Sequence, residues 1–219
     1  MALNELTQGL GVADVIDAMT MAFNHRAHII SLDSPDPKRV LFGPAVTISY
    51  LPVRKDLMDP EKHSLGPAFY GAIGDDDPTG KVLVMASNGH TDISLGGGTK
   101  LSRLRNHKMA GILCDGSLRD YEELNSYDFA VYCHGETVRA GGNLIQPYLT
   151  DVPVCVYGVT VVPGDYIFAQ GSAAVVIPRD SVQEILTKSR KIMHKMDEVK
   201  GALVNEDPQM VLQKGSSEL

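Results

Sequence analysis

The sequence contains no uninterrupted apolar run that approaches the ~20 residues of a membrane-spanning helix. Its first residues, Met1 to Glu5, lack the charged segment and apolar core of a secretory signal peptide. Basic residues are outnumbered, because 20 Lys and Arg stand against 27 Asp and Glu, for a formal net charge of -7. A broad nucleic-acid surface needs clustered basic residues, so this balance excludes one and leaves room only for a local basic pocket. We therefore expect a cytoplasmic protein that binds neither membranes nor nucleic acid.

Cysteine is scarce, and its placement argues against disulfides. The three cysteines, Cys114, Cys133 and Cys155, are odd in number and form no CxxC pair. Each lies in an apolar, strand-like run, which predicts three buried free thiols in a reducing compartment. A catalytic thiol is the alternative interpretation.

What the sequence does contain is enough apolar material for a core: 43% of its 219 residues are hydrophobic. The pattern predicts one α/β domain over residues 1–219, with a core over about 12–180, a helix over about 181–200 and a polar tail over 205–219. Helices are expected at Val12–Phe23, at Thr99–His107 and after Ser181, where Ser181 and Glu184 fit a capping box. Short buried strands are expected at 81–86, 110–114, 129–133, 152–157, 166–169 and 173–177, and residues 40–51 read as strands interrupted by Gly43-Pro44.

The most informative segment runs from Gly111 to Asp120, where an apolar run ends in Asp-Gly and an Arg-Asp pair follows. Arg119 offers two parallel N–H donors to a carboxylate, and Asp120 offers a hard oxygen to Mg²⁺ or Mn²⁺. Upstream, Gly96 to Gly98 precede a predicted helix, whose first-turn N–H groups favour an anion. The pattern matches neither dinucleotide nor triphosphate motifs, so it predicts a site for a small oxo-acid and a metal.

Three further residues are candidates for the same site. Asp92 precedes the glycines and could add a carboxylate, although an ordinary loop acid is the simpler interpretation. Glu123 lies one helical turn from Arg119 and could orient its guanidinium or pair with it at the surface. His134 follows a predicted strand and could line the pocket.

These residues together resemble the RraA-like family, which includes 4-hydroxy-4-methyl-2-oxoglutarate aldolases with oxaloacetate decarboxylase activity and regulators of ribonuclease activity. The specific part is the segment from Gly111 to Asp120 in register with Leu95-Gly96-Gly97. The supporting parts are 15–18, 43–47, 81–84, 163–165 and 175–178.

The resemblance implies a swivelling β/β/α fold and homotrimers or homohexamers with active sites at subunit interfaces. It implies that Arg119 binds a pyruvyl carboxylate, that Asp120 ligates Mg²⁺ or Mn²⁺, and that the backbone around Gly97, Gly98, Thr99 and Lys100 binds the oxo-acid. The aldolases carry an acid 21 positions before the arginine, where this chain has Gly98. The combination of Gly98 with Arg119, Asp120 and Glu123 resembles the ribonuclease-regulator branch of the family more than the aldolases.

The leading functional hypothesis is a metal-dependent lyase that cleaves a C–C bond of a 2-oxo acid, by retro-aldol cleavage or decarboxylation, through a pyruvate enolate. Two alternatives stay open. The chain could be a non-catalytic protein that binds a ribonuclease or helicase, or it could run another metal-dependent reaction at the same site.

Overall fold

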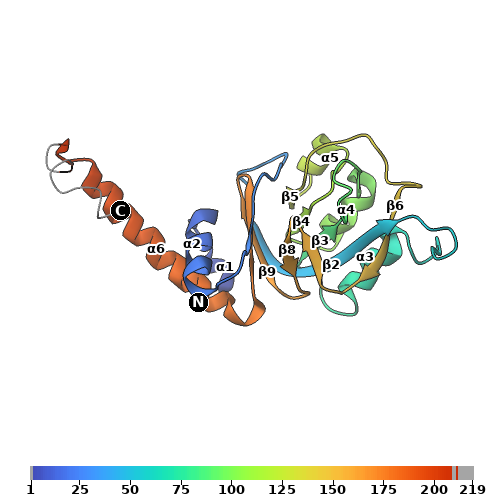
Figure 1. The fold of residues 1–219 in the computed structure, drawn as a ribbon, viewed down its shortest axis with the longest axis horizontal. Coiled ribbons are helices and arrows are strands. Elements are labelled where there is room, and N and C mark those ends of the chain that lie inside the picture. The colour runs from blue at the N-terminus through green and yellow to red at the C-terminus, as the bar shows by residue number, and fades with distance from the viewer. Residues whose placement is uncertain (1, 209–210, 212–219) are drawn as a thin grey trace.

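A mixed eight-stranded sheet forms the centre of the protein in the computed structural model, which describes residues 2–208 and 211 (Figure 1). The strand order is β1-β10-β9-β2-β3-β4-β5, β6 pairs with β2 beside this path, and β7 and β8 form a separate two-stranded sheet. The strands are β1 (His28–Ile29), β2 (Leu41–Pro52), β3 (Val82–Ala86), β4 (Gly111–Cys114), β5 (Ala130–Tyr132), β6 (Ile145–Thr150), β7 (Val154–Val156), β8 (Val159–Val161), β9 (Tyr166–Gln170) and β10 (Ala173–Ile177).

Helices cover this sheet in two groups. The helices are α1 (Leu3–Leu6), α2 (Val12–Ala22), α3 (Leu65–Ile73), α4 (Gly98–Asn106), α5 (Tyr121–Asn125) and α6 (Val182–Leu203). Apolar residues of α3, α4 and α5 share one core with β2 to β5, and those of α1, α2 and α6 share another with β9 and β10. The β7–β8 sheet closes a third core on the remaining face of the parallel strands. The predicted α/β class with flanking helices is confirmed.

The parallel strands position the site. β2, β3, β4 and β5 run parallel to one another, so their carboxyl ends lie along one edge. β3 and β4 are buried along their whole lengths, as expected for parallel strands covered on both faces. The loop after β3 carries Gly96 and Gly97 and leads into Gly98 at the start of α4, and the loop after β4 carries Arg119, so both lie at the edge where α/β proteins gather functional groups.

The predicted interruption at Gly43-Pro44 is wrong, because β2 continues through both residues. β2 pairs with β9 up to Pro44 and with β3 from Ala45. Pro44, which has no N–H to donate, therefore lies where the partner strand changes, and β2 tolerates it there. Gly43 is needed for packing, since a Cβ atom there would overlap the carbonyl oxygen of Gly80.

Three local expectations also need correction. Ser181 makes no side-chain cap to α6, because it lies in a 3-10 turn (Arg179–Ser181) that leads into the helix. Cys114 and Cys133 are buried as predicted, but Cys155 is exposed, since β7 buries only alternate residues. The strands β6 and β8 and the helix α5 were not anticipated, and most of the predicted polar tail lies outside the described residues.

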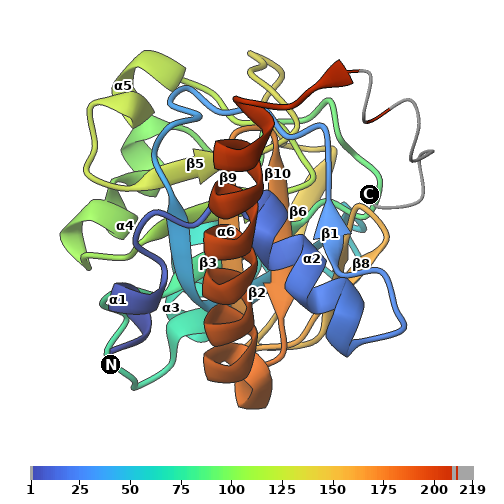
Figure 2. The ribbon, with the colours of Figure 1, turned by 90° about the vertical axis from the view of Figure 1, so that its left-hand side faces the viewer.

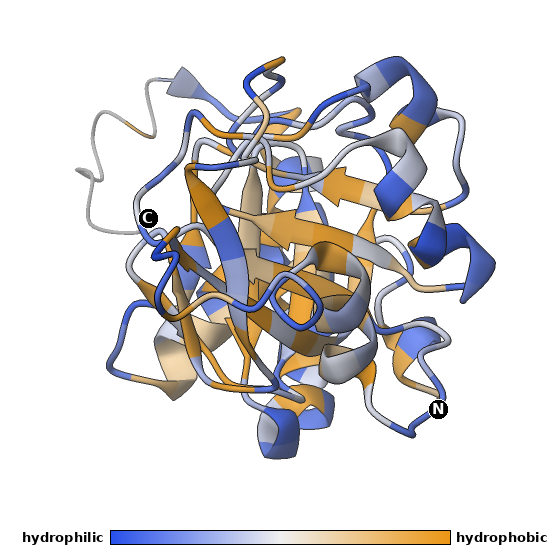
Figure 3. Ribbon diagram, turned by 90° about the vertical axis from the view of Figure 1, so that its right-hand side faces the viewer, coloured by the Kyte–Doolittle hydropathy of each residue, from blue (hydrophilic) through white to orange (hydrophobic). Residues whose placement is uncertain are grey.

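Helix α6 extends beyond the body of the protein. Its first half packs beside α2 across the β9–β10 end of the sheet, and its second half projects away (Figures 1 and 2). Its buried residues all lie in its first eight positions. Hydrophobic residues are otherwise concentrated in the strands (Figure 3). None of the described helices is long and apolar enough to cross a membrane.

Gly43→Ala should destabilise the fold by about 1–3 kcal/mol, because the added methyl group must push β2 away from the Gly80 carbonyl. Urea denaturation of the purified protein measures this free energy of unfolding. Gly201→Ala is the control, since nothing lies within 4 Å of a Cβ atom at Gly201; because alanine favours a helix, it should raise the free energy of unfolding by up to about 1 kcal/mol and not lower it. Equal effects of the two substitutions would contradict the packing role of Gly43.

Candidate functional site

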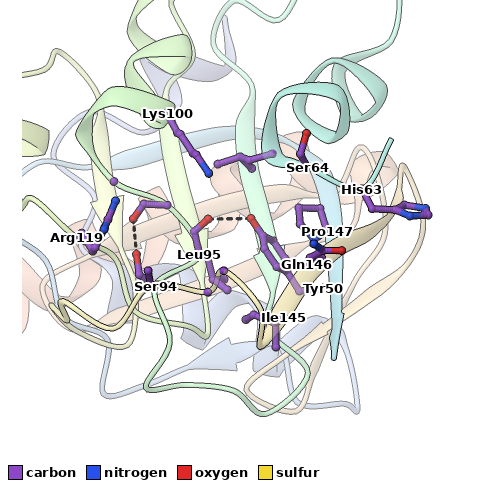
Figure 4. A pocket seen from close by; sticks show the side chains of 16 residues that line it. Tyr50, His63, Ser64, Ser94, Leu95, Lys100, Arg119, Ile145, Gln146 and Pro147 are labelled. Carbon is purple, nitrogen blue, oxygen red and sulfur yellow. Dashed lines mark hydrogen bonds between the residues drawn. The ribbon is translucent and has the colours of Figure 1, made fainter. Parts of the chain in front are cut away.

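The glycine turn after β3 is joined to the loop after β4 by backbone hydrogen bonds. The Arg119 N–H donates to the Gly96 carbonyl over 3.0 Å, and the Leu95 N–H donates to the Ser117 carbonyl over 2.9 Å. Two buried side chains hold the turn from the other side. The Tyr50 hydroxyl donates to the Leu95 carbonyl at 2.9 Å, and the Ser94 hydroxyl donates to the Gly96 carbonyl at 2.7 Å (Figure 4). The turn and Arg119 are thus fixed as one unit.

A cavity of about 240 Å³ opens beside this unit. Arg119, Lys100 and the backbone of Gly96 and Gly97 form part of its wall. The opposite wall comes from the start of α3 and from β6, including Ser64 and Gln146 (Figure 4). Sequence patterns gave no sign of these last contributors, because neither segment carries a recognisable motif.

Asp120 does not face the same cavity as Arg119. It adopts the left-handed conformation (φ 65°, ψ 47°), which non-glycine residues other than Asn and Asp seldom adopt. Its Oδ2 accepts the Gly98 N–H over 3.0 Å, so the carboxylate caps α4. The expectation that the Gly98 amide is free for a ligand is therefore wrong, whereas the amides of Thr99 and Lys100 have no acceptor among the described residues.

Glu123 lies over Gly98 instead of beside Arg119. A Cβ atom at Gly98 would overlap the Glu123 carboxylate, so the carboxylate fills the space that a side chain at position 98 would need. The Tyr127 hydroxyl donates to Glu123 Oε1 at 2.5 Å, and this hydrogen bond raises the pKa of Tyr127. Among the described residues, no ion pair joins Glu123 to Arg119, so the predicted orienting contact is absent.

Gly97 lies beside both Arg119 and Asp120. A Cβ atom there would stand 2.5 Å from Asp120 Oδ2 and 3.4 Å from Arg119 Nε, so only glycine lets both side chains flank the turn. Arg119 lines the cavity, and Asp120 lines an open recess together with Glu122, Glu123 and Ser126. The two hollows adjoin at Gly97, because both side chains lie next to the same point of the turn.

The carboxylates of Asp120 and Glu123 suit a divalent cation whose remaining ligands are water and substrate oxygens. No group of three or more His, Cys, Asp or Glu side chains suited to a metal occurs in the described part of the chain. Asp120 and Glu123 each keep one carboxylate oxygen that no described group uses. Mg²⁺ commonly takes one or two protein carboxylates and completes its shell with water and substrate oxygens, so these two residues are sufficient in kind.

Two other candidates lie outside the cavity. Asp92 forms an ion pair with Arg139, which the loop position of both residues permits, and it lines no part of the Arg119 cavity. His134 makes a 2.7 Å hydrogen bond through Nδ1 to the Tyr157 hydroxyl and also lies away from the cavity. Asp92 is thus the ordinary loop acid of the simpler interpretation, and the alternative that either residue lines the pocket is not supported.

Comparison with known proteins identifies the family. The Aldolase/RraA model of RraA-like proteins matches residues 12–176. The chain belongs to the RraA-like family. It is 29% identical to protein DlpA of Legionella pneumophila over 196 residues, 89% of this chain and 30% of DlpA. It is 28% identical to a protein of Halalkalibacterium halodurans named as a putative 4-hydroxy-4-methyl-2-oxoglutarate aldolase, over 51% of this chain and 53% of that protein.

Solved structures share the RraA-like fold. Streptomyces coelicolor RraAS2, described as an unusual member of the RNase ES inhibitor RraA protein family, superposes with a TM-score of 0.77 at 24% identity, over 90% of this chain and 95% of that one. A Pseudomonas syringae protein superposes with a TM-score of 0.75 at 21% identity, over 94% and 93% of the two chains. The family therefore contains proteins named as aldolases and proteins named as ribonuclease inhibitors, and the curated relatives extend well beyond the matched segments.

The buried carboxyl of Asp115, directly after β4, should make the stability of the protein depend on pH. Burial raises the pKa of its carboxyl, and the Ser87 N–H, 2.5 Å from Oδ1, only partly opposes the shift. Because the folded pKa lies above the unfolded value of about 3.9, the folded state binds the proton more tightly. Stability should then fall as the pH rises through the interval between the two values.

Asp115→Asn should flatten that part of the stability–pH curve, as measured by urea denaturation between pH 3.5 and 7. Asp17→Asn, which changes an exposed carboxylate on α2, is the control. An unchanged curve for Asp115→Asn would refute the assignment.

Proposed function

We propose that the protein is a divalent-metal-dependent lyase that cleaves a C–C bond of a small 2-oxo acid, by retro-aldol cleavage or decarboxylation, and leaves a pyruvate enolate. The observation that carries this proposal is the position of the Glu123 carboxylate above Gly98. It supplies, from α5, an acid in the space where the resembling aldolases have one on the glycine turn. The glycine at position 98 is then no obstacle to the chemistry.

Arg119 binds the substrate carboxylate in this proposal. Its half-buried side chain has no ion-pair partner among the described residues, and it lines the cavity beside the glycine turn. A guanidinium fork fixes the orientation of a carboxylate as well as its charge. The amides of Thr99 and Lys100, which have no acceptor among the described residues, would donate to the same group in this proposal.

Asp120 and Glu123 would hold the divalent cation, which when bound stabilises the negative charge that develops on the 2-oxo oxygen. Asp120 has a second task, because its other oxygen caps α4 and so keeps the Thr99 and Lys100 amides in position. Tyr127 positions Glu123 through its hydroxyl.

The decisive assay measures pyruvate release from oxaloacetate and from 4-hydroxy-4-methyl-2-oxoglutarate with Mg²⁺ or Mn²⁺. Glu123→Gln and Asp120→Asn should each lower kcat about 100-fold, because each removes a charge needed for the cation. Asparagine keeps the left-handed backbone and an acceptor for the Gly98 amide, so this variant tests the charge and spares the cap. Asp128→Asn, an exposed acid outside both hollows, is the control. No turnover of either substrate by the native protein would end the proposal.

Arg119→Lys separates positioning from charge. Lysine keeps the positive charge but loses the two-pronged geometry, so we expect KM to rise about tenfold with a smaller fall in kcat. Steady-state kinetics with oxaloacetate measures the split. A fall in kcat alone, with KM unchanged, would argue that Arg119 does not bind the ground-state carboxylate.

A regulatory role is the second candidate, because RraAS2, whose fold this chain shares, is described as belonging to a family of ribonuclease inhibitors. The acidic composition of the chain would suit a basic partner. Asp120→Asn distinguishes the two roles: a lyase loses turnover, whereas a regulator keeps its affinity for the ribonuclease or helicase partner.

We also propose that the protein is a homotrimer or homohexamer that uses the projecting half of α6. That half exposes Met196, Val199 and Leu203, which repeat at the spacing of one helix face. The same half carries two lysines (Lys195 and Lys200) and two acids (Asp197 and Glu198), so its formal charges balance and the exposed apolar face carries the proposed contact between copies.

Val199→Glu combined with Leu203→Glu should convert the oligomer to monomers, because two buried apolar contacts would become charged. Sedimentation velocity measures the change. Val138→Glu, at a body residue that is 92% exposed, is the control and should leave the mass unchanged. A native protein that sediments as a monomer would contradict the assembly.

A further inference from the structure

The cavity beside Arg119 is lined by positive charges only, although the protein as a whole is acidic. Its wall includes two cationic side chains, Arg119 and Lys100, and no Asp or Glu. Neither cation has an ion-pair partner among the residues that the structure describes. A single carboxylate on Arg119 would therefore leave the exposed Lys100 ammonium, at the rim of the same 240 Å³ space, with water as its only partner.

Lys100 also stands where a lysine weakens its own helix. It lies in the first turn of α4, a nine-residue helix with no acid in that turn. The positive end of the helix dipole repels a cation there, at a cost of a few tenths of a kcal/mol. The Asp120 carboxylate offsets the dipole at the Gly98 amide but makes no ion pair with Lys100, and a bound anion would pair with the Lys100 charge directly.

At the far end of the cavity two backbone amides lack acceptors, and the Gln146 Oε1 in the same wall is a buried acceptor without a donor in the described part of the chain. The start of α3 lines it through Ser64 and Leu65, and Ser64 makes no side-chain cap. The Leu65 and Gly66 amides have no acceptor among the described residues, because the first bond of this helix runs from Ala68 to Ser64. Figure 4 shows the Lys100 side chain reaching from α4 into the space between Arg119 and Ser64.

We propose that Lys100 is the specificity-determining residue of the site: its ammonium binds a second anionic group of the substrate, with the amides that open α3 behind it. The ligand is then a dianionic 2-oxo acid whose 2-oxo-carboxylate end lies on Arg119 and whose distal carboxylate lies on Lys100. This inference rests on the proposed function, since it describes the other half of the same substrate. Lys100 selects the substrate and takes no part in bond cleavage.

The test uses two probes that cannot be cleaved, so it reads binding without turnover. Isothermal titration calorimetry in the presence of Mg²⁺ compares 2-oxoglutarate, a dianion, with 2-oxobutyrate, a monoanion. The native protein should bind 2-oxoglutarate about 10- to 100-fold more tightly, the usual size of one charge-assisted contact. Lys100→Met should abolish this preference and leave the 2-oxobutyrate affinity within about threefold.

Three further variants sharpen the result. Lys100→Arg keeps the charge and should retain most of the preference for the dianion. Arg119→Met should weaken both probes alike, because both carry the 2-oxo-carboxylate group. Lys188→Met, on the surface of α6, controls for a general change in charge and should alter neither affinity.

Two outcomes would overturn the inference: equal affinity of the native protein for the two probes, or an equal loss of both affinities in Lys100→Met. The lyase assay remains separate. Selective binding of 2-oxoglutarate without turnover of any 2-oxo acid would refute the proposed function and support the role of Lys100. Turnover without selectivity would do the reverse.

Discussion

Two backbone hydrogen bonds, from Arg119 to Gly96 and from Leu95 to Ser117, join the loops that leave β3 and β4. Because parallel strands end at the same edge, these loops need only this short connection to become one rigid unit. Arg119, Asp120 and the start of α4 then have fixed relative positions before any ligand arrives. A site assembled in this way does not spend binding energy on ordering its own parts.

The charged side chains of the site can lie close together because Gly97 and Gly98 have no side chains. Gly97 lets both Arg119 and Asp120 lie close to the turn, and Gly98 leaves space for the Glu123 carboxylate of α5. The same acidic function can therefore reach the turn from a different point in the chain. Family membership alone does not distinguish catalysis from regulation here, because proteins named for each occur among the relatives.

The sequence predicted what local patterns encode. The buried runs at β3 and β4 and the glycine start of α4 follow from composition and periodicity. β6 was missed because Pro147 argues against a strand, yet a register shift where β6 meets β2 at Tyr50 accommodates it. The contact of Glu123 with Gly98 could not be predicted, because it depends on how α5 packs against α4. The loop position of Asp92 followed from the sequence, but its ion pair with Arg139, 47 residues away, did not.

The uneven burial of the thiols has a practical consequence. Cys114 and Cys133 are sealed in the core, while Cys155 faces outward from β7. A maleimide dye would therefore attach to the native protein at one place, without engineered cysteines. Stored without reductant, the same side chain would cross-link neighbouring molecules through an adventitious bond that has nothing to do with their assembly.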